Sequence, residues 1–162
     1  MVDPRVASLA GIVELNNSLF AKALDGLDRR AQLARLGDGG SPIIWIAGHL
    51  VSARVGMASL LGEPRPVPWG GMFGRGAQVP EDSLLPQAEE ILSAWGEASE
   101  VLVARLNAAT AAQLAAPSPR NFPISDKSVV GGLTFLVYHE GYHLGQLTTL
   151  RKAQGLPGLV DA

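Results

Sequence analysis

The residues in this chain best suited to chemistry are its histidines, and two of them fall in one short pattern. Residues 138–146 read YHEGYHLGQ, which contains the sequence HEGYH from His139 to His143. The pattern H-E-x-x-H on a helix is a zinc motif, in which two histidines one turn apart bind the ion and the glutamate acts as the general base of a metalloprotease. The first question is therefore whether this chain is a metal-dependent protease.

The chain has only one further histidine, His49. On a helix that turns about 100° per residue, His143 lies about 40° and Gln146 about 20° from His139, on an apolar stripe. Two histidines at this spacing have Cβ atoms about 5–6 Å apart, close enough to chelate one ion. His49 also shares a helical face with apolar residues, so we expect all three imidazoles to point into the protein interior.

Inward histidines also have a structural interpretation, in which each ring is an ordinary core residue with a hydrogen-bond partner. Three unpaired imidazoles in one core would be costly, and a shared cation would relieve that cost. Three nitrogen ligands also leave a metal position open for water or substrate. We therefore predict one divalent metal ion bound by His49, His139 and His143. An all-imidazole site suits Zn, Ni or Fe, and affinity alone does not choose among them.

The protease interpretation requires residues that the chain lacks. The extended motif needs glycine at position 146 and histidine at 149, where this chain has Gln146 and Thr149. The thermolysin type needs a glutamate on a later helix, and the only acid after His143 is Asp161. Protease activity is therefore disfavoured. Glu140, about 100° from His139, remains a candidate as an acceptor that orients an imidazole, as a general base, or as a partly exposed helix carboxylate.

Composition narrows the class of protein. The chain has 162 residues, 47% hydrophobic and 17% charged, and it contains no cysteine. These values are typical of a single globular domain spanning residues 1–162, without disulfides or a catalytic thiol. The net charge of -2 gives no basic footprint for nucleic acid or an anionic membrane. We expect a cytoplasmic protein that acts on a small molecule.

Four segments have helical periodicity, and none has convincing strand alternation. They are residues 3–27, 42–61, 81–108 and about 126 or 128 to 154, with Ile12 and Leu84 among the side chains expected inward. Ser41 is expected to cap the second helix. Residues 63–80 are rich in proline and glycine and are long enough to reach the far end of a neighbouring helix. The expected fold is an all-α four-helix bundle with a long crossover loop between its second and third helices.

Three stretches of this sequence are distinctive together: IIWIAGHL, the FGRG loop at residues 73–76, and FLVYHEGYHLGQLTTLRKAQGLP. They resemble the DinB-like superfamily, a group of four-helix-bundle metal proteins. The resemblance implies a divalent ion held by one histidine of the second helix and two of the fourth, which here are His49, His139 and His143. It also implies a homodimer. Characterised relatives include S-transferases for thiols such as bacillithiol or mycothiol, and a thiol-dependent maleylpyruvate isomerase.

These observations favour a metal-dependent transferase that activates an external low-molecular-weight thiol. The alternatives are a non-catalytic metal-binding or dimeric interaction bundle, and a metal-dependent hydrolase that uses bound water and Glu140. Gln146 is a candidate to donate to substrate or to a ligand's outer nitrogen, or else a buried amide that bonds across helices. Arg75 is either a contact for an anionic substrate group or a solvated arginine.

Overall fold

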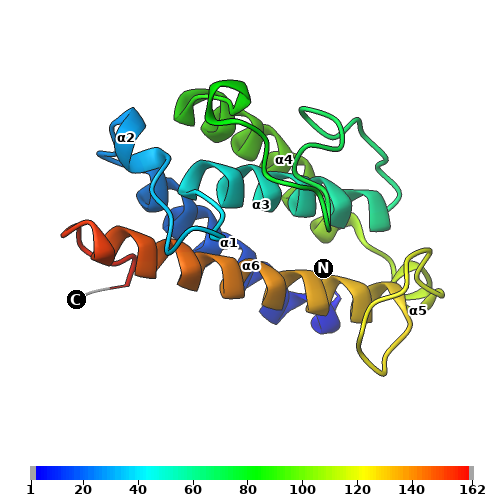
Figure 1. Cartoon of the computed structure of the whole chain (residues 1–162). Coiled ribbons are helices and arrows are strands. Elements are labelled where there is room, and N and C mark those ends of the chain that lie inside the picture. The colour runs from blue at the N-terminus through cyan, green and yellow to red at the C-terminus, as the bar shows by residue number, and fades with distance from the viewer. Residues whose placement is uncertain (1–2, 161–162) are drawn as a thin grey trace.

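The computed structural model describes residues 3–160, and its regular structure is helical throughout that range. The helices are α1 (Pro4–Leu24), α2 (Arg29–Gln32), α3 (Ile43–Leu60), α4 (Ala88–Ala108), α5 (Ala111–Ala115) and α6 (Val129–Ala153), with a short 3₁₀ helix, η1 (Asp82–Leu84) (Figure 1). The described residues form no strand, only an isolated bridge between Pro117 and Ser128. The prediction of an all-helical fold is confirmed. Asp161, the only acid after His143, lies outside the described residues.

The four long helices α1, α3, α4 and α6 pack against one another and enclose the core. Asn16 of α1 bonds to Glu140 of α6, and farther along both helices Arg151 bonds to the carbonyl of Ala23, so α1 and α6 run in the same direction. α3 lies against α6 in the opposite direction (Figure 1). This antiparallel contact brings the second and fourth predicted helices together, as the three-histidine site requires.

α3 is the central core helix, since its own residues are buried on nearly every face. By length and composition it could cross a membrane, but buried core helices of soluble proteins pass the same test, and 78% of this window is buried inside the molecule. The helix begins after Pro42, which makes no side-chain capping bond, so the expected capping by Ser41 is wrong.

Two of the residues expected inward, Leu84 and Ile12, are exposed. α4 begins at Ala88 rather than near residue 81, because Pro86 disfavours helical backbone at the residue before it. Leu84 therefore lies in η1, outside α4, and is 62% exposed. Ile12 is 44% exposed on α1, although Val13 beside it is buried. The short helix α5 was not expected from the sequence.

The start of α6 shapes the loop that precedes it. Ser128 caps the helix by accepting a hydrogen bond from the Gly131 amide, 3.2 Å away. A Cβ atom at Gly131 would lie 2.4 Å from the carbonyl oxygen of Asp126, and one at Gly132 would lie 2.7 Å from the Phe122 ring. The two glycines therefore let residues 117–128 fold closely back onto the helix. The Leu60 side chain of α3 would also lie 3.1 Å from a Cβ atom at Gly132, so a neighbouring helix approaches there as well.

Candidate metal centre

The three histidines converge on one point between α3 and α6. His49 Nε2 lies 3.0 Å from His139 Nε2, and His143 Nε2 lies 3.1 Å from the same atom. One ligand atom from each residue lies within 4.8 Å of the others, and all three side chains are half-buried. Metal–imidazole bonds are about 2.0–2.1 Å long, so two nitrogens about 3 Å apart can share one ion. The predicted convergence of His49, His139 and His143 is therefore present in the structure.

Hydrogen bonds on the outer nitrogens fix which ring atoms carry protons. His49 Nδ1 lies 2.7 Å from the carbonyl oxygen of Phe73, which can only accept, so this nitrogen donates. His143 Nδ1 lies 2.6 Å from Gln146 Oε1 and donates in the same way. In the neutral rings the Nε2 atoms of His49 and His143 consequently carry lone pairs. Both lone pairs are free to bind a cation between the rings.

The cluster cannot satisfy its own hydrogen bonds without a further partner. His139 Nε2 faces both other rings, and its single proton could bond to only one of their lone pairs. His139 Nδ1 is buried and has no hydrogen-bond partner among the described residues. One cation bound by all three Nε2 atoms would remove the competition among them and give three favourable contacts, with the His139 proton then on Nδ1. The residues present therefore fit a divalent metal ion.

His49 is held by its neighbours on α3 and by the loop of residues 63–80. The Trp45 ring stacks parallel to the His49 ring, with centroids 5.5 Å apart. The Phe73 ring is fully buried against Gly48, where a Cβ atom would lie 2.6 Å from it. Gly48 thus lets Phe73 approach α3 closely enough for its carbonyl to orient His49. The FGRG loop therefore supports the candidate metal site through its first residue.

Burial keeps the two α6 histidines neutral. Desolvation, followed by the nearby His143 and His49 rings, lowers the pKa of His139 from 6.5 to about 4. Desolvation also lowers the pKa of His143, although its hydrogen bond with Gln146 acts in the opposite direction. A metal ligand must be deprotonated, so these shifts reduce competition from protons at neutral pH.

Glu140 points away from the histidines into the core, where it pairs with Arg54 of α3. Arg54 Nε donates to one carboxylate oxygen at 2.8 Å and Arg54 Nη2 to the other at 2.6 Å. Asn16 of α1 donates to Glu140 at 3.0 Å, and the Arg54 guanidinium lies 3.8 Å from the centroid of the Trp95 ring. Both charged side chains are 0% exposed. The interpretation of Glu140 as a partly exposed carboxylate is wrong.

Gln146 lies beside the triad and bonds within its own helix. Besides accepting from His143, it donates to the Tyr142 hydroxyl at 3.4 Å. The alternative of a buried amide bonded across helices is therefore wrong, because both partners are on α6. Gln146 accepts from the outer nitrogen of His143, so the hypothesis that it donates to a ligand's outer nitrogen is wrong.

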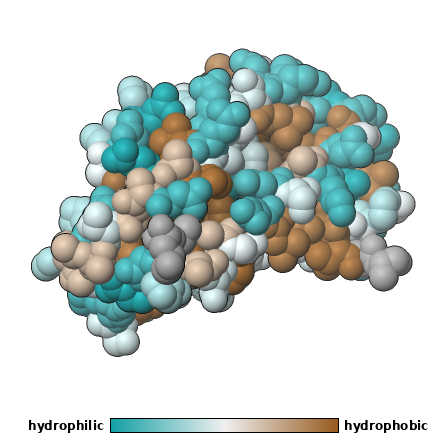
Figure 2. Space-filling model, turned by 180° about the vertical axis from the view of Figure 1, so that it is seen from behind, coloured by the Kyte–Doolittle hydropathy of each residue, from teal (hydrophilic) through white to brown (hydrophobic). Residues whose placement is uncertain are grey.

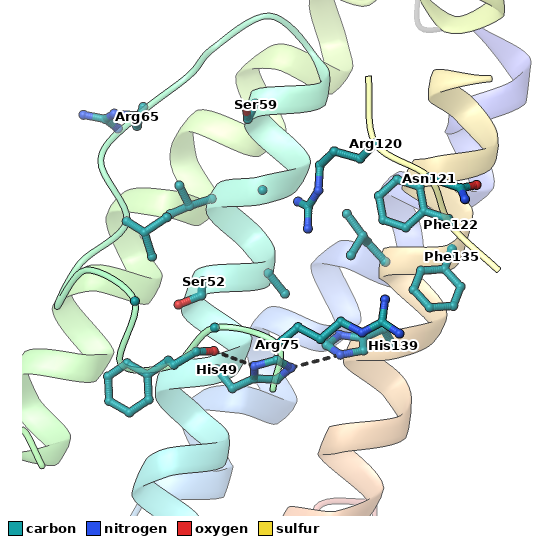
Figure 3. A pocket seen from close by; sticks show the side chains of 18 of the residues that line it. His49, Ser52, Ser59, Arg65, Arg75, Arg120, Asn121, Phe122, Phe135 and His139 are labelled. Atoms are coloured by element: carbon teal, nitrogen blue, oxygen red, sulfur yellow. Dashed lines mark hydrogen bonds between the residues drawn. The ribbon is translucent and has the colours of Figure 1, made fainter. Parts of the chain in front are cut away.

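The triad lies between two cavities. The larger, about 570 Å³, is lined by His49 and His139 and by side chains from residues 65–75 and 120–123 (Figure 3). The smaller, about 370 Å³, is lined by His143, Gln146 and Trp45. The candidate metal-binding histidines are therefore divided between the two cavities, with His49 and His139 at the larger and His143 at the smaller. An ion bound by all three would be near both cavities.

The fold and site define an all-helical protein with a candidate three-histidine metal centre. The sequence matches the family model of the DinB superfamily over residues 13–147, which include all three histidines. The chain therefore belongs to the DinB superfamily, a group of metal-binding proteins, as the sequence resemblance indicated. A comparison with curated proteins found no match.

Sequence reasoning missed two groups that shape this site. The Phe73 backbone carbonyl, which accepts from His49, has no side-chain signal. Arg54 does have one, since it is the only charged residue of the mostly apolar α3 and comes five residues after His49. A charged residue in such a helix indicates a buried partner.

Proposed function

We propose that this DinB superfamily member is a metal-dependent transferase acting on a low-molecular-weight thiol and a small electrophile. The observation that carries the proposal is the convergence of three Nε2 atoms, two of them with lone pairs fixed by outer hydrogen bonds. His49, His139 and His143 would hold one divalent ion. Bound there, the ion would lower the pKa of a thiol cosubstrate, so that thiolate exists at neutral pH.

The chemical step would join the thiol sulfur to an electrophilic carbon. The sulfur forms the new bond, the leaving group departs with the electron pair of the bond that breaks, and the thiol proton passes to water. No cysteine is present in the chain, so the sulfur must come from a second molecule. The protein's part is to hold both reactants beside the three histidines and to keep these rings neutral.

The two cavities support a reaction with two substrates. His49 and His139 face the larger cavity and His143 faces the smaller one, so two reactants could reach the site from different sides. A hydrolase that uses Glu140 has less support, because Arg54 and Asn16 already engage both of its carboxylate oxygens. A non-catalytic metal-binding protein remains the alternative that experiment must separate.

Two measurements on protein purified without a nickel column test the proposal. Elemental analysis should find about one divalent ion per wild-type chain and a near-zero amount in His139→Ala. This variant lacks His139 Nε2, the atom that lies 3.0 Å from His49 Nε2 and 3.1 Å from His143 Nε2. Metal-loaded protein should then conjugate monochlorobimane to a small thiol, with loss of chloride, faster than the metal-free form. Equal, near-zero metal content in both proteins would refute the site. Bound metal without thiol transfer would support the non-catalytic alternative.

We also infer that the four long helices form a four-helix bundle in which residues 61–87 cross over between α3 and α4.

We further infer that the protein is a cytoplasmic homodimer. Hydrophobic patches are visible on the face shown in Figure 2. Exposed apolar or aromatic side chains on the neighbouring helices α1 and α6 are Ile12, Leu15, Tyr138 and Tyr142. A second copy could cover them. Light scattering should give a mass of twice the chain for wild-type protein and a lower mass for Leu15→Glu.

A further inference from the structure

The larger cavity has a strongly one-sided charge. Three arginines line it, Arg65, Arg75 and Arg120, and none of the described residues that line it is an aspartate or glutamate. Positive charge without nearby carboxylates favours an anionic ligand, and low-dielectric walls strengthen the attraction. Phe122 and Phe135 line the same cavity with ring centroids 5.4 Å apart, so its wall also has an aromatic part.

These three guanidinium groups are exposed and, like that of Arg30, have no acceptor within the described part of the chain. Most other arginines bond to a carboxylate or a backbone carbonyl, namely Arg5, Arg29, Arg35, Arg54, Arg105 and Arg151. The Arg120 guanidinium carbon lies 5.5 Å from the Phe122 ring centroid, and this group makes no hydrogen bond within the described part of the chain. Its five N–H donors are therefore available to a ligand.

Arg120 is presented by a well-anchored loop. The Ser118 hydroxyl donates to the Arg120 carbonyl at 2.8 Å, and Lys127 Nζ donates to the Phe122 carbonyl at 2.7 Å. From this loop the side chain extends into the space between α3 and α6 (Figure 3), whereas Arg65 points away from that space. Arg75 extends over His49 toward His139 (Figure 3), so Arg120 is the arginine placed to contact a molecule at the end of the cavity away from the histidines.

Gly56 fixes where the guanidinium group rests. A Cβ atom at Gly56 would lie 2.7 Å from Arg120 Nη1, so only glycine leaves room for this close approach. Gly56 comes seven residues after His49, which places both on one face of α3 about 10 Å apart along the helix axis. Arg120 therefore lies about two helical turns from the histidine end of the cavity, where Arg75 supplies a second guanidinium (Figure 3).

We propose that the larger cavity binds an elongated organic carboxylate, with its carboxylate on Arg120 and its other end beside His49 and His139. A guanidinium offers two parallel N–H donors that match the two oxygens of a carboxylate. The apolar and aromatic wall between the two ends suits an uncharged middle section of the ligand. The part of this inference that places the reactive end at the histidines rests on the proposed function; the carboxylate site on Arg120 does not.

The test uses calorimetric titration of the full chain with 8-mercaptooctanoate and with its uncharged amide. Metal-free wild-type protein should bind the carboxylate more tightly than the amide, and added salt should reduce this preference. Arg120→Gln should weaken carboxylate binding by roughly tenfold to a hundredfold and leave amide binding unchanged. Arg30→Gln, which removes an exposed arginine outside the cavity, should bind both as the wild type does.

Gly56→Ala provides a second variant that keeps the charge but displaces it. The new methyl group would push the flexible Arg120 side chain away, while alanine favours the helix, so carboxylate affinity should fall without loss of stability. Equal affinity for the carboxylate and the amide in wild type, or unchanged carboxylate affinity in Arg120→Gln, would overturn the proposal. Tighter binding of 8-mercaptooctyl phosphate would overturn the carboxylate assignment in favour of a phosphate.

The same titration separates this inference from the proposed function. In metal-loaded protein, the ω-mercaptoalkanoates should bind most tightly when their length matches the distance between Arg120 and the histidines. A carboxylate preference that depends on Arg120 but not on metal or length would support the anion site and count against thiol binding at the metal. Thiol transfer without a carboxylate preference would support the proposed function and refute this inference.

Discussion

Replacing Glu140 with glutamine tests whether this residue stabilises the core or acts in catalysis. The two side chains have nearly the same shape, so the change removes the charge with little change in packing. It would leave the fully buried Arg54 guanidinium without its carboxylate and place amide hydrogens against a group that can only donate.

The expected loss of stability is large. Removing one partner of a buried ion pair costs about 3–5 kcal/mol, because the other charge remains buried and uncompensated. Three contacts of Arg54 would remain and reduce this cost: the Ser99 hydroxyl at 3.0 Å, the Asn17 side chain and the Trp95 ring. Native domains are stable by about 5–15 kcal/mol, so the variant should remain folded but become measurably weaker.

Urea unfolding of metal-free protein, followed by circular dichroism, measures this loss. Glu97→Gln is the matched control, because Glu97 is an exposed glutamate of α4 and its replacement should change stability by less than about 0.5 kcal/mol. The double variant Arg54→Met with Glu140→Leu should regain most of the lost stability, since apolar residues of similar size often replace buried ion pairs without cost.

The outcome also decides whether Glu140 has a catalytic role. If Glu140 is structural, folded Glu140→Gln should still bind about one metal ion per chain. Unchanged stability together with loss of a metal-dependent activity would refute this reasoning and restore Glu140 as a general base.

Three further predictions concern the groups around the histidines. Gly48→Ala should push the Phe73 ring away and weaken metal binding by about 10–100-fold in competition with a chelating dye, with helix content unchanged. Gln146→Leu should weaken it by a similar factor, whereas Gln146→Glu, which keeps an acceptor for His143, should bind metal at least as well as wild type. Between pH 6.5 and about 4, His139 is protonated in the unfolded chain but not in the folded metal-free protein. The unfolding free energy of the metal-free protein should therefore decrease as the pH is lowered through this window, and it should decrease less in His139→Leu.

The candidate metal ligands could be predicted from the sequence because their geometry is local. His139 and His143 are four residues apart on one long helix, and helical periodicity alone places them on one face. His49 could be added because its own helix also directs it inward. The only long-range step was the expectation that these two helices are neighbours, which the contact between α3 and α6 confirms.

The role of Glu140 could not be predicted because it depends on a contact between distant residues. Its helical angle gave its direction, but the partner in that direction, Arg54, is 86 positions away in the sequence. The same limit applies to Arg120, whose position depends on close packing of a loop against Gly56 rather than on periodicity. The start of α4 is a different case, because Pro86 is visible in the sequence and its restriction of the preceding residue is a local effect.

The Arg54–Glu140 pair also explains how the histidines can converge before any metal binds. Arg54 lies five residues after His49 on α3, and Glu140 directly follows His139 on α6. Two parallel hydrogen bonds between Arg54 and Glu140 hold these helices in one axial position, and a slip of one turn would break both bonds and bury two unpaired charges. The same alignment brings His49 Nε2 within 3.0 Å of His139 Nε2, on a face of α6 about 100° from Glu140. The ion pair on the core side therefore preorganises the ligands on the cavity side, so binding should require little rearrangement of the helices.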